Sequence, residues 1–240
     1  SSTTITNPSG SLPSMTSSDN ITWTGTFTPS ANTEVDNNRL SLSTSWTDLA
    51  GNNGPAADAT PNYDVDTRAP TVSSIAITSA AGIQIGCANS FVNAGDVVSV
   101  TATFSEPVIV DNASGNPTLT LVVDNTNRTA TYASGSCSTQ LVFQYTIQAG
   151  DTNDDGGISI VANPLDLHNS STIRDAALND AILTHSLVSD NANYKVDTTT
   201  PTVSSVAITS AAGIQNSFVN AGDNVSVTAT FSEPVIVDNA

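Results

Sequence analysis

One short segment of the sequence, Asp151-Thr152-Asn153-Asp154-Asp155-Gly156-Gly157, is rich in oxygen-bearing side chains and ends in two glycines. Side-chain oxygens at loop positions 1, 3 and 5, with glycine at position 6, form the first half of an EF-hand-type calcium loop. We therefore predict a Ca²⁺ site in which Asp151, Asn153 and Asp155 offer side-chain oxygens and Gly157 a backbone carbonyl. Ala162 replaces the usual final glutamate, so the remaining ligands must come from elsewhere. The alternative is an acidic hairpin turn, because Asn, Asp and Gly are also ordinary turn residues.

An internal repeat divides the chain into units that must position this loop. TVSSIAITSAAGIQ, which begins at Thr71, recurs as TVSSVAITSAAGIQ at Thr202, and residues 89–113 recur as residues 216–240 with one substitution. Similar connectors, NYDVDTRAP and NYKVDTTTP, precede the two copies, and their prolines favour short, stiff links. We predict the C-terminal part of one repeat at 1–68, a complete repeat at 69–198 and the N-terminal part of a further repeat at 199–240.

Hydrophobic periodicity indicates the fold of each unit. Apolar residues recur at every second position in residues 98–104 and again in residues 141–147, with Ser, Thr and Gln between most of them. This period is typical of half-buried antiparallel strands. About seven short strands separated by Gly, Asn and Asp turns fit the complete unit. The prediction is an all-β chain of tandem immunoglobulin-like antiparallel β-sandwiches, with the first and last copies truncated.

Sandwich topology places other acidic residues near the predicted calcium loop. The loop that contains Asp96 is expected at the same end as Asp151, and the connector that contains Asp197 leaves from that end. Carboxylates crowded together repel one another unless a cation lies among them. We therefore add Asp96 and Asp197 to the predicted ligands. A second junction site for Ca²⁺ is expected at the opposite end, from Asp66, Glu106 and Asp175.

Charge and composition argue against several functional classes. The chain has 22 acidic and 5 basic side chains and a net charge of −17, which disfavours binding to nucleic acid or to an anionic membrane. No apolar stretch approaches the roughly 18 residues of a membrane-spanning helix, so membrane insertion is not expected. Neither histidine, His168 or His185, lies in a nucleophile or zinc-ligand pattern. We therefore expect a protein that is not an enzyme.

The two cysteines form one candidate disulfide. Cys87 lies in the four-residue stretch 85–88 that the later copy lacks, and Cys137 lies in a predicted turn. We predict that they pair, which could stabilise the fold by about 4 kcal/mol through closure of a loop of about 50 residues. The alternative is two unpaired thiols in separate loops, with Cα atoms more than roughly 7 Å apart.

Several motifs resemble the bacterial immunoglobulin-like repeats of very large adhesins, namely AGDVVSVTATFSE, TYASGS, YTIQAGDTNDDGGISI, TDLAGN and the DTRAP and DTTTP connectors. The resemblance implies export, retention at the cell surface, a role as extender arrays in attachment and biofilm formation, and calcium binding at domain junctions. One departure is the turn RDAALND, where Leu178 stands in place of the family's glycine. A left-handed backbone conformation there would be strained with leucine.

The function expected from these observations is that of a structural extender repeat of a bacterial cell-surface adhesin, located outside the cell and stiffened by calcium. Its partners would be neighbouring repeats of the same chain. One alternative is an immunoglobulin-like module that binds a surface glycan or host ligand, although such faces usually need exposed aromatic rings. A second alternative is an accessory domain of a secreted polysaccharide-degrading enzyme.

Overall fold

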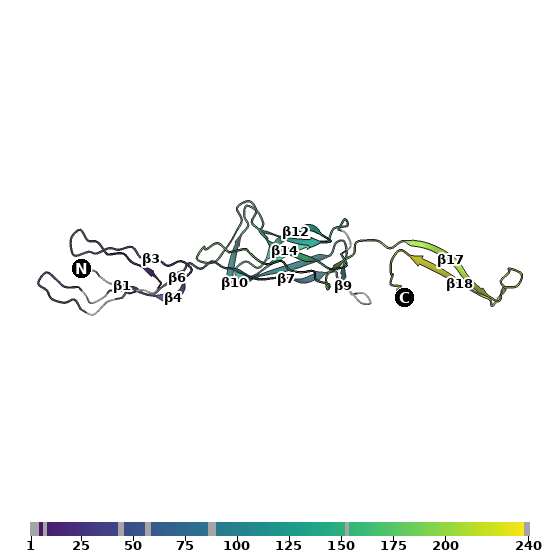
Figure 1. Ribbon diagram of the computed structural model, residues 1–240, viewed down its shortest axis with the longest axis horizontal. Helices are drawn as coiled ribbons and strands as arrows, with labels where there is room; N and C mark the ends of the chain where they lie inside the picture. Colours follow the sequence, from purple (N-terminus) through teal and green to yellow (C-terminus); the bar gives the residue numbers. More distant parts are fainter. Residues whose placement is uncertain are drawn as a thin grey trace.

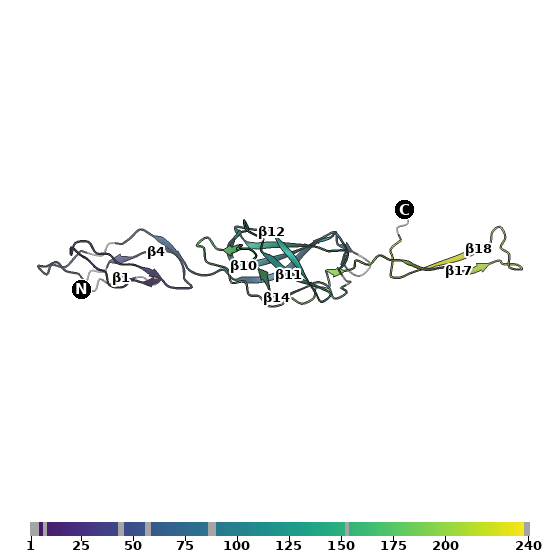
Figure 2. The same cartoon turned by 90° about the horizontal axis from the view of Figure 1, so that it is seen from above.

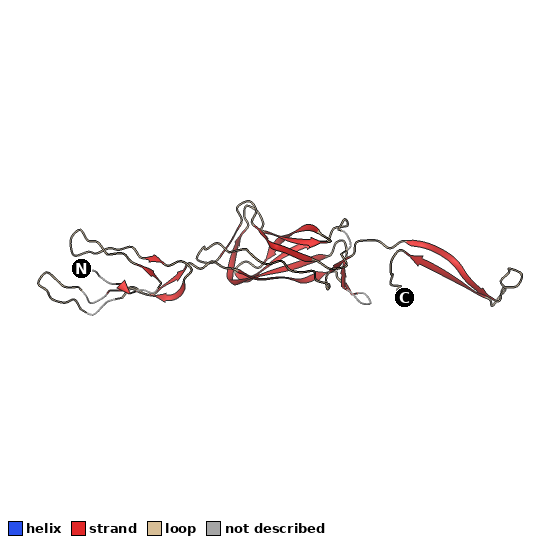
Figure 3. Ribbon diagram, in the orientation of Figure 1, coloured by secondary structure: helices blue, strands red, loops and turns tan. Residues whose placement is uncertain are grey.

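The computed structural model describes residues 5–6, 9–42, 46–55, 59–85, 90–151 and 154–237. These residues are all-β, with no helix among them (Figure 3). None of them therefore forms a helix that could cross a membrane. Within these ranges each strand pairing joins strands of one segment, which we name N-terminal (5–66), central (71–196) or C-terminal (203–237). The three segments follow one another along the long axis of the molecule (Figures 1 and 2).

The N-terminal segment consists of short antiparallel pairs. Its strands are β1 (Ile5–Thr6), β2 (Gly10–Ser11), β3 (Thr28–Pro29), β4 (Glu34–Asn38), β5 (Ser41–Leu42) and β6 (Tyr63–Asp66). They pair as β1 with β5, β2 with β3 and β4 with β6. Strand β6 leads directly into the connector to the central segment, so its last residue, Asp66, lies at the junction.

The central segment contains the main core. Its strands are β7 (Val72–Ala81), β8 (Gln84–Ile85), β9 (Ser90–Val92), β10 (Val97–Asp111), β11 (Thr118–Val123), β12 (Thr126–Ser134), β13 (Ser138–Thr146), β14 (Ser159–Asp166), β15 (Thr172–Arg174) and β16 (Lys195–Val196). Seven of them form a sheet of order β14-β11-β12-β13-β10-β15, in which β7 also pairs with β10. Strand β9 pairs with β8 and, in parallel, with β16.

The predicted alternation on β10 is confirmed by its burial. Val98, Val100, Ala102 and Phe104 are buried, whereas the residues between them are only partly buried. They pack with the buried side chains of β11 and β13, including Leu121 and Phe143, in one core cluster. Figure 1 shows β12 and β14 lying across from β7, so that the core is enclosed between strands.

Strand β10 changes partners along its length. Its first part pairs with β7 and β13, and its last residues pair with β15. The register with β13 shifts between Thr103 and Val108, around Pro107, which has no N–H to donate to a ladder. This irregularity places Glu106 at the end of the central segment that faces the N-terminal connector.

The C-terminal segment repeats the first hairpin of the central segment. Strand β17 (Val203–Ala212) pairs with β18 (Asn224–Phe231). Val227 lies opposite Ile208, as Val100 lies opposite Ile77 in β10 and β7. Nearly identical sequence thus gives the same pairing, including the positions of the register shifts.

Candidate metal centre at the junction of two segments

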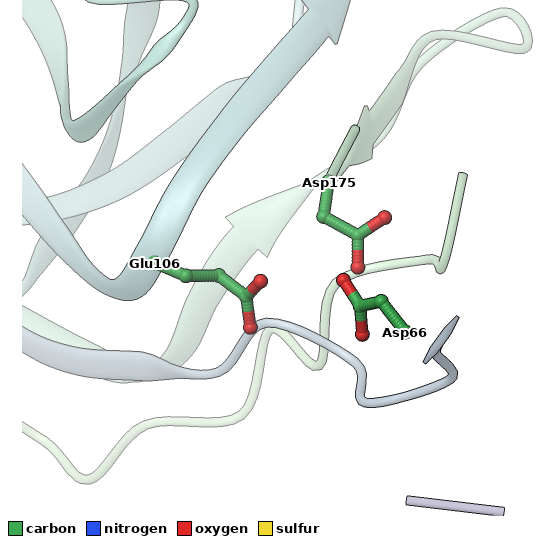
Figure 4. Close-up of side chains that lie close together, drawn as sticks. All are labelled: Asp66, Glu106 and Asp175. Carbon is green, nitrogen blue, oxygen red and sulfur yellow. The ribbon is translucent and has the colours of Figure 1, made fainter. Parts of the chain in front are cut away.

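Three carboxylates from distant parts of the chain meet at the junction between the N-terminal and central segments. Asp66 ends β6, Glu106 lies within β10, and Asp175 directly follows β15. One carboxylate oxygen of each lies within 4.8 Å of the other two. Figure 4 shows the three side chains pointing toward one another. The three acids that the sequence analysis groups at this junction therefore lie together, and calcium binding by them stays a prediction.

Glu106 has the least satisfied carboxylate of the three. Its Oε1 atom is buried and has no hydrogen-bond partner among the described residues. Burial raises the pKa of the Glu106 carboxyl above its usual value, and the negative charges of Asp66, Glu34 and Asp175 raise it further. A carboxylate in this position needs a proton or a cation to offset the burial and the repulsion.

Asp175 is held by its own loop and is only 1% exposed. Its Oδ1 accepts a hydrogen bond from the Asn179 backbone N–H at 2.9 Å, and its Oδ2 accepts one from Asn179 Nδ2 at 2.8 Å. The same amide group approaches the Asp66 carbonyl oxygen at 3.4 Å. Asn179 therefore links the loop of the central segment to the end of the N-terminal segment.

The N-terminal segment contains the same type of loop. Asp48 accepts hydrogen bonds from Asn52 N at 2.8 Å and from Asn52 Nδ2 at 2.8 Å. These bonds, the side-chain one foremost, hold the pKa of Asp48 below its usual value. The left-handed position is taken by Gly51 in this loop, with φ of 87°, and by Leu178 in the central loop, with φ of 71°. The left-handed conformation considered for Leu178 is thereby confirmed, and it carries the strain that glycine avoids.

Asp151, the first residue of the predicted calcium loop, has a different role. It is 2% exposed, and its Oδ1 accepts a hydrogen bond from Arg128 Nε. Its Oδ2 accepts hydrogen bonds from the Tyr145 hydroxyl at 2.8 Å and from Gln148 N at 2.9 Å. Both oxygens are thus engaged, and a guanidinium already supplies the positive charge, so this carboxylate is a structural anchor. Burial, followed by the bond to Asp151, raises the pKa of Tyr145 to about 12.

The structure describes the other residues of the predicted loop only in part. Asn153 lies outside the described residues, and Asp155 is exposed. Gly157 has φ of 91°, and a Cβ there would lie 2.0 Å from the Asn191 carbonyl oxygen, so the position requires glycine to make a tight turn. The carboxylate that organises the turn is Asp154, whose Oδ1 accepts from the backbone N–H of Gly156 and of Gly157.

Sequence reasoning missed Asp154 and Arg128. An aspartate followed two and three residues later by glycine is typical of an Asx turn, which could have identified Asp154. Arg128 is one of only 5 basic residues in the chain, and its rarity beside so many carboxylates was a signal for a structural ion pair.

The loops expected at one end of the central segment do lie together. The backbone N–H of Ile147, four residues before Asp151, donates to the Asp96 carbonyl oxygen at 2.9 Å. The Thr198 hydroxyl donates to the Asp151 carbonyl oxygen at 2.6 Å, which ties the connector to this end. The predicted placement of these loops is confirmed.

Asp96 and Asp197 have local roles at that end. Asp96 Oδ2 accepts a hydrogen bond from Asn93 N at 2.8 Å and closes the turn before β10. Asp197 Oδ1 accepts one from Thr199 N at 3.0 Å within the connector. Neither residue belongs to a group of three candidate ligand atoms within the part of the chain that the structure describes. These contacts give both residues capping roles, and a calcium site shared with Asp151 stays a prediction.

The repeat reproduces two of the three junction carboxylates. Asp197 occupies the connector position of Asp66, and Glu233 occupies the strand position of Glu106. The Oε1 atom of Glu233 is likewise buried without a hydrogen-bond partner among the described residues. The unsatisfied glutamate is therefore a property of the repeat and not an accident of one copy.

The predicted disulfide finds no support in the described structure. Cys137 is an exposed free thiol in the turn between β12 and β13, and its N–H donates to the Val108 carbonyl oxygen at 2.8 Å. Cys87 lies outside the described residues, so the pairing stays a prediction.

Comparison with known proteins shows that part of the chain is similar to a known family. Residues 1–65 match the family model of the bacterial Ig-like domain. No curated protein and no solved structure matches the chain. The family match covers the N-terminal segment up to the residue before Asp66. It agrees with the all-β structure.

Proposed function

We propose that this chain is a non-catalytic extender of a bacterial cell-surface adhesin, in which Ca²⁺ bound at the junctions holds successive immunoglobulin-like repeats in line. The observation that carries this proposal is the group formed by Asp66, Glu106 and Asp175, in which carboxylates from two segments meet. The partners are neighbouring repeats of the same chain, and the location is outside the cell.

The geometry of the group suits calcium. Ca²⁺ binds oxygen ligands at about 2.3–2.6 Å, so two oxygens on opposite sides of one ion lie about 5 Å apart. The observed limit of 4.8 Å between the carboxylate oxygens is compatible with one shared ion. The buried Oε1 of Glu106, which has no donor among the described residues, is the strongest single reason to expect a cation there.

The position of the group explains why an ion would stiffen the molecule. Asp66 belongs to the N-terminal segment, whereas Glu106 and Asp175 belong to the central segment. Segments joined by a short connector over a small polar contact are mobile by default. An ion shared by both sides adds a strong link and removes the repulsion among the three carboxylates. The end-to-end order of the segments in Figures 1 and 2 is the shape that an extender needs.

Calorimetric titration of the chain with CaCl₂ tests the metal site. We expect Glu106→Gln to weaken binding at this junction by roughly tenfold or more, because a charged ligand becomes neutral while the side chain keeps its size. Asp166→Asn is the matched control, since this exposed carboxylate belongs to neither predicted calcium site and should leave the affinity unchanged. Equal affinities for wild type and Glu106→Gln would contradict the proposed site.

Two further measurements test the extender role. At a hundredfold excess of free Ca²⁺ over the dissociation constant, binding stabilises the folded form by about 2.7 kcal/mol, which raises the melting temperature by roughly 10 °C. Small-angle scattering should show a larger maximum dimension with Ca²⁺ than with a chelator, because the junction is fixed. An unchanged melting temperature and an unchanged maximum dimension would remove the support for calcium stiffening.

A further inference from the structure

Strand β7 leaves one edge of the sheet in the central segment open. On one side it pairs with β10 along its length. On the other side it has a described neighbour only at its start, where Ile182 N donates to the Pro70 carbonyl oxygen at 2.8 Å and the Ile182 carbonyl oxygen accepts from Val72 N at 3.3 Å. No described strand pairs with this outer edge from Ser73 to Ala81. The edge is open although strands enclose the core that β7 helps to cover.

The stretch that contains this edge is uncharged in a strongly acidic protein. Residues 69–95 include no Asp, Glu, Lys or Arg, whereas the chain has a net charge of −17. The neighbouring strands are also uncharged beside β7, since neither β13 nor residues 97–104 of β10 contain a charged side chain. Two acidic copies repel one another over much of the remaining surface. They therefore meet at the lowest electrostatic cost along β7.

Strand β7 lacks several of the devices that protect edge strands from pairing. Natural edges are often very short, or they carry charged side chains or proline. Strand β7 has 10 residues, none of them charged and none of them proline. It does have two register shifts against β10, which leave Ser73 and Thr78 as extra residues. Residues 74–77 lie between these shifts and keep a regular ladder, so a partner strand can pair there.

The side chains of this regular stretch both hold the edge in place and leave it accessible. Ile75 and Ile77 point into the core and are 4% and 8% exposed, which fixes the backbone of β7 against β10. Ser74 and Ala76 alternate with them on the outer face, where both are exposed and small. A partner strand can therefore approach to the usual spacing of about 4.7–4.9 Å without meeting a bulky side chain.

We propose that two copies of this chain associate side by side through β7, whose open edges pair antiparallel about a two-fold axis near Ala76 and join two sheets into one. An edge strand is complementary to a second copy of itself in this arrangement, because each free N–H of one copy meets a free C=O of the other. This association is lateral, so it goes beyond the proposed extender function, which concerns the order of segments along one chain.

Charge is the reason to expect a second copy at this edge. A basic partner would be drawn to the acidic ends of the central segment, where groups such as Asp66, Glu106 and Asp175 gather. The uncharged edge offers such a partner no attraction. An identical uncharged edge, in contrast, brings no charge into the contact and loses none of its own to burial.

The contact is weak at one repeat and gains strength from recurrence. The 10 residues of β7 are fewer than the roughly 20–30 residues a side of a standard interface, so a single pairing is transient. The same strand recurs at residues 202–212, with Val206 in place of Ile75, and it pairs with β18 in the same register. Arrays that lie side by side can therefore pair at several repeats, which raises the overall affinity without a new kind of contact.

Sedimentation velocity over a concentration series tests the proposal in a chelator, so that the result does not depend on the proposed calcium site. We expect wild type to associate reversibly, and more strongly at higher salt because the remaining charges are screened. Ala76→Lys and Ala76→Asp each bring two like charges together near the two-fold axis. Both should weaken association by roughly tenfold or more.

Thr131→Lys and Thr131→Asp are the matched controls. Thr131 is exposed on β12 of the same sheet, but strands lie on both sides of it, since it pairs with Gln144 and with Thr118. These variants change the net charge by the same amount as the Ala76 variants and should associate as wild type does. Thr131 variants that associate as weakly as the Ala76 variants would contradict the edge contact.

Hydrogen exchange of wild type locates the contact without any substitution. Backbone amides within residues 73–81 should exchange more slowly at high than at low protein concentration, whereas those of β12 should not change. Three outcomes would overturn the proposal: a wild-type chain that stays monomeric at every concentration, slower exchange confined to residues outside β7, or an Ala76→Lys variant that associates more strongly than wild type through attraction to acidic residues.

Discussion

At the scale of single residues, hydrogen-bond partners decide what each carboxylate does. Asp151 and Asp175 are both nearly fully buried, but Asp151 faces the guanidinium of Arg128, whereas Asp175 faces two further carboxylates. A buried carboxylate with a cationic partner is already neutralised, and one among other acids is not. The same residue type therefore anchors the fold at one end of the central segment and forms a candidate metal ligand at the other.

Replacement of Asp151 tests its anchoring role. We expect Asp151→Ala to lower the free energy of unfolding by about 3 kcal/mol, because Arg128 keeps a partly buried charge and Tyr145 loses an acceptor. Urea unfolding measured in chelator separates this loss from any effect on metal binding. Asp155→Ala, at an exposed position of the same loop, should change stability by less than about 0.5 kcal/mol. A loss that vanishes in chelator would indicate a metal ligand after all.

Leu178 provides a second test at this scale. Its φ of 71° costs leucine roughly 1–2 kcal/mol, and the side chain is 70% exposed, so little burial is lost on its removal. We expect Leu178→Gly to stabilise the fold by about 0.5–1 kcal/mol after the greater chain entropy of glycine in the unfolded state is included. Thermal unfolding measures the gain. Leu178→Ala is the control and should give no gain, because alanine retains the Cβ that causes the strain.

At the scale of elements, nearly identical hairpin sequences have unequal burial. The hairpins β7–β10 and β17–β18 share their register, yet Val100 is fully buried and Val227 is 62% exposed. The difference comes from the strands that follow β10, which cover its face in the central segment. Strand pairing is thus set locally by the sequence, whereas burial depends on elements that arrive from elsewhere.

A pair of matched substitutions measures this difference. We expect Val100→Ala to lower the free energy of unfolding of the central segment by about 2 kcal/mol, because two buried carbon atoms are lost and a cavity is left. Val227→Ala removes the same atoms from the equivalent position and should cost less than about 0.5 kcal/mol, because Val227 is 62% exposed. Denaturant midpoints of both variants check the comparison. Equal losses of unfolding free energy in the two variants would mean that the Val227 side chain is as buried in solution as that of Val100.

At the scale of the whole molecule, the acidic net charge governs the response of the protein to pH and to cations. The net charge of −17 is carried by an excess of aspartate in turns, caps and connectors, where most of the carboxylates accept backbone hydrogen bonds. At the junction the carboxylates come from two segments and repel one another. The molecule is therefore most sensitive to protons and cations where the segments meet.

The raised pKa of Glu106 predicts a specific dependence on pH. The folded state binds its proton more tightly than the unfolded state does, so stability falls as pH rises from the ordinary glutamate value of 4.5 through the raised pKa. In chelator at neutral pH we therefore expect Glu106→Gln to melt at a higher temperature than wild type, and at low pH the two should converge. With Ca²⁺ the order reverses, because wild type gains the ion. Melting curves across pH with and without Ca²⁺ check both statements, and a variant less stable than wild type in chelator would refute the first.

The sequence by itself determined the secondary structure class, the repeat and the local turns. Alternation of apolar residues is a local signal, since every second side chain of a strand points to one face, and it correctly identified the buried positions of β10. The strain at Leu178 was equally local, because a turn's backbone conformation depends on a few adjacent residues. The three acids of the junction were grouped from sequence through the expected sandwich topology, which depends only on the order of strands.

Only the tertiary structure decided which of the acidic positions has a partner. Arg128 and Asp151 are 23 residues apart and meet because β12, β13 and the following loop pair in one register, which no local pattern encodes. The first carboxylate of the EF-hand-like loop motif is therefore engaged in a structural ion pair. Glu106, by contrast, ends without a partner, because the bend of β10 at Pro107 turns it into the junction and away from any donor in the described structure. Residue type gives a side chain its chemical capacity, and long-range strand pairing decides whether that capacity is already used.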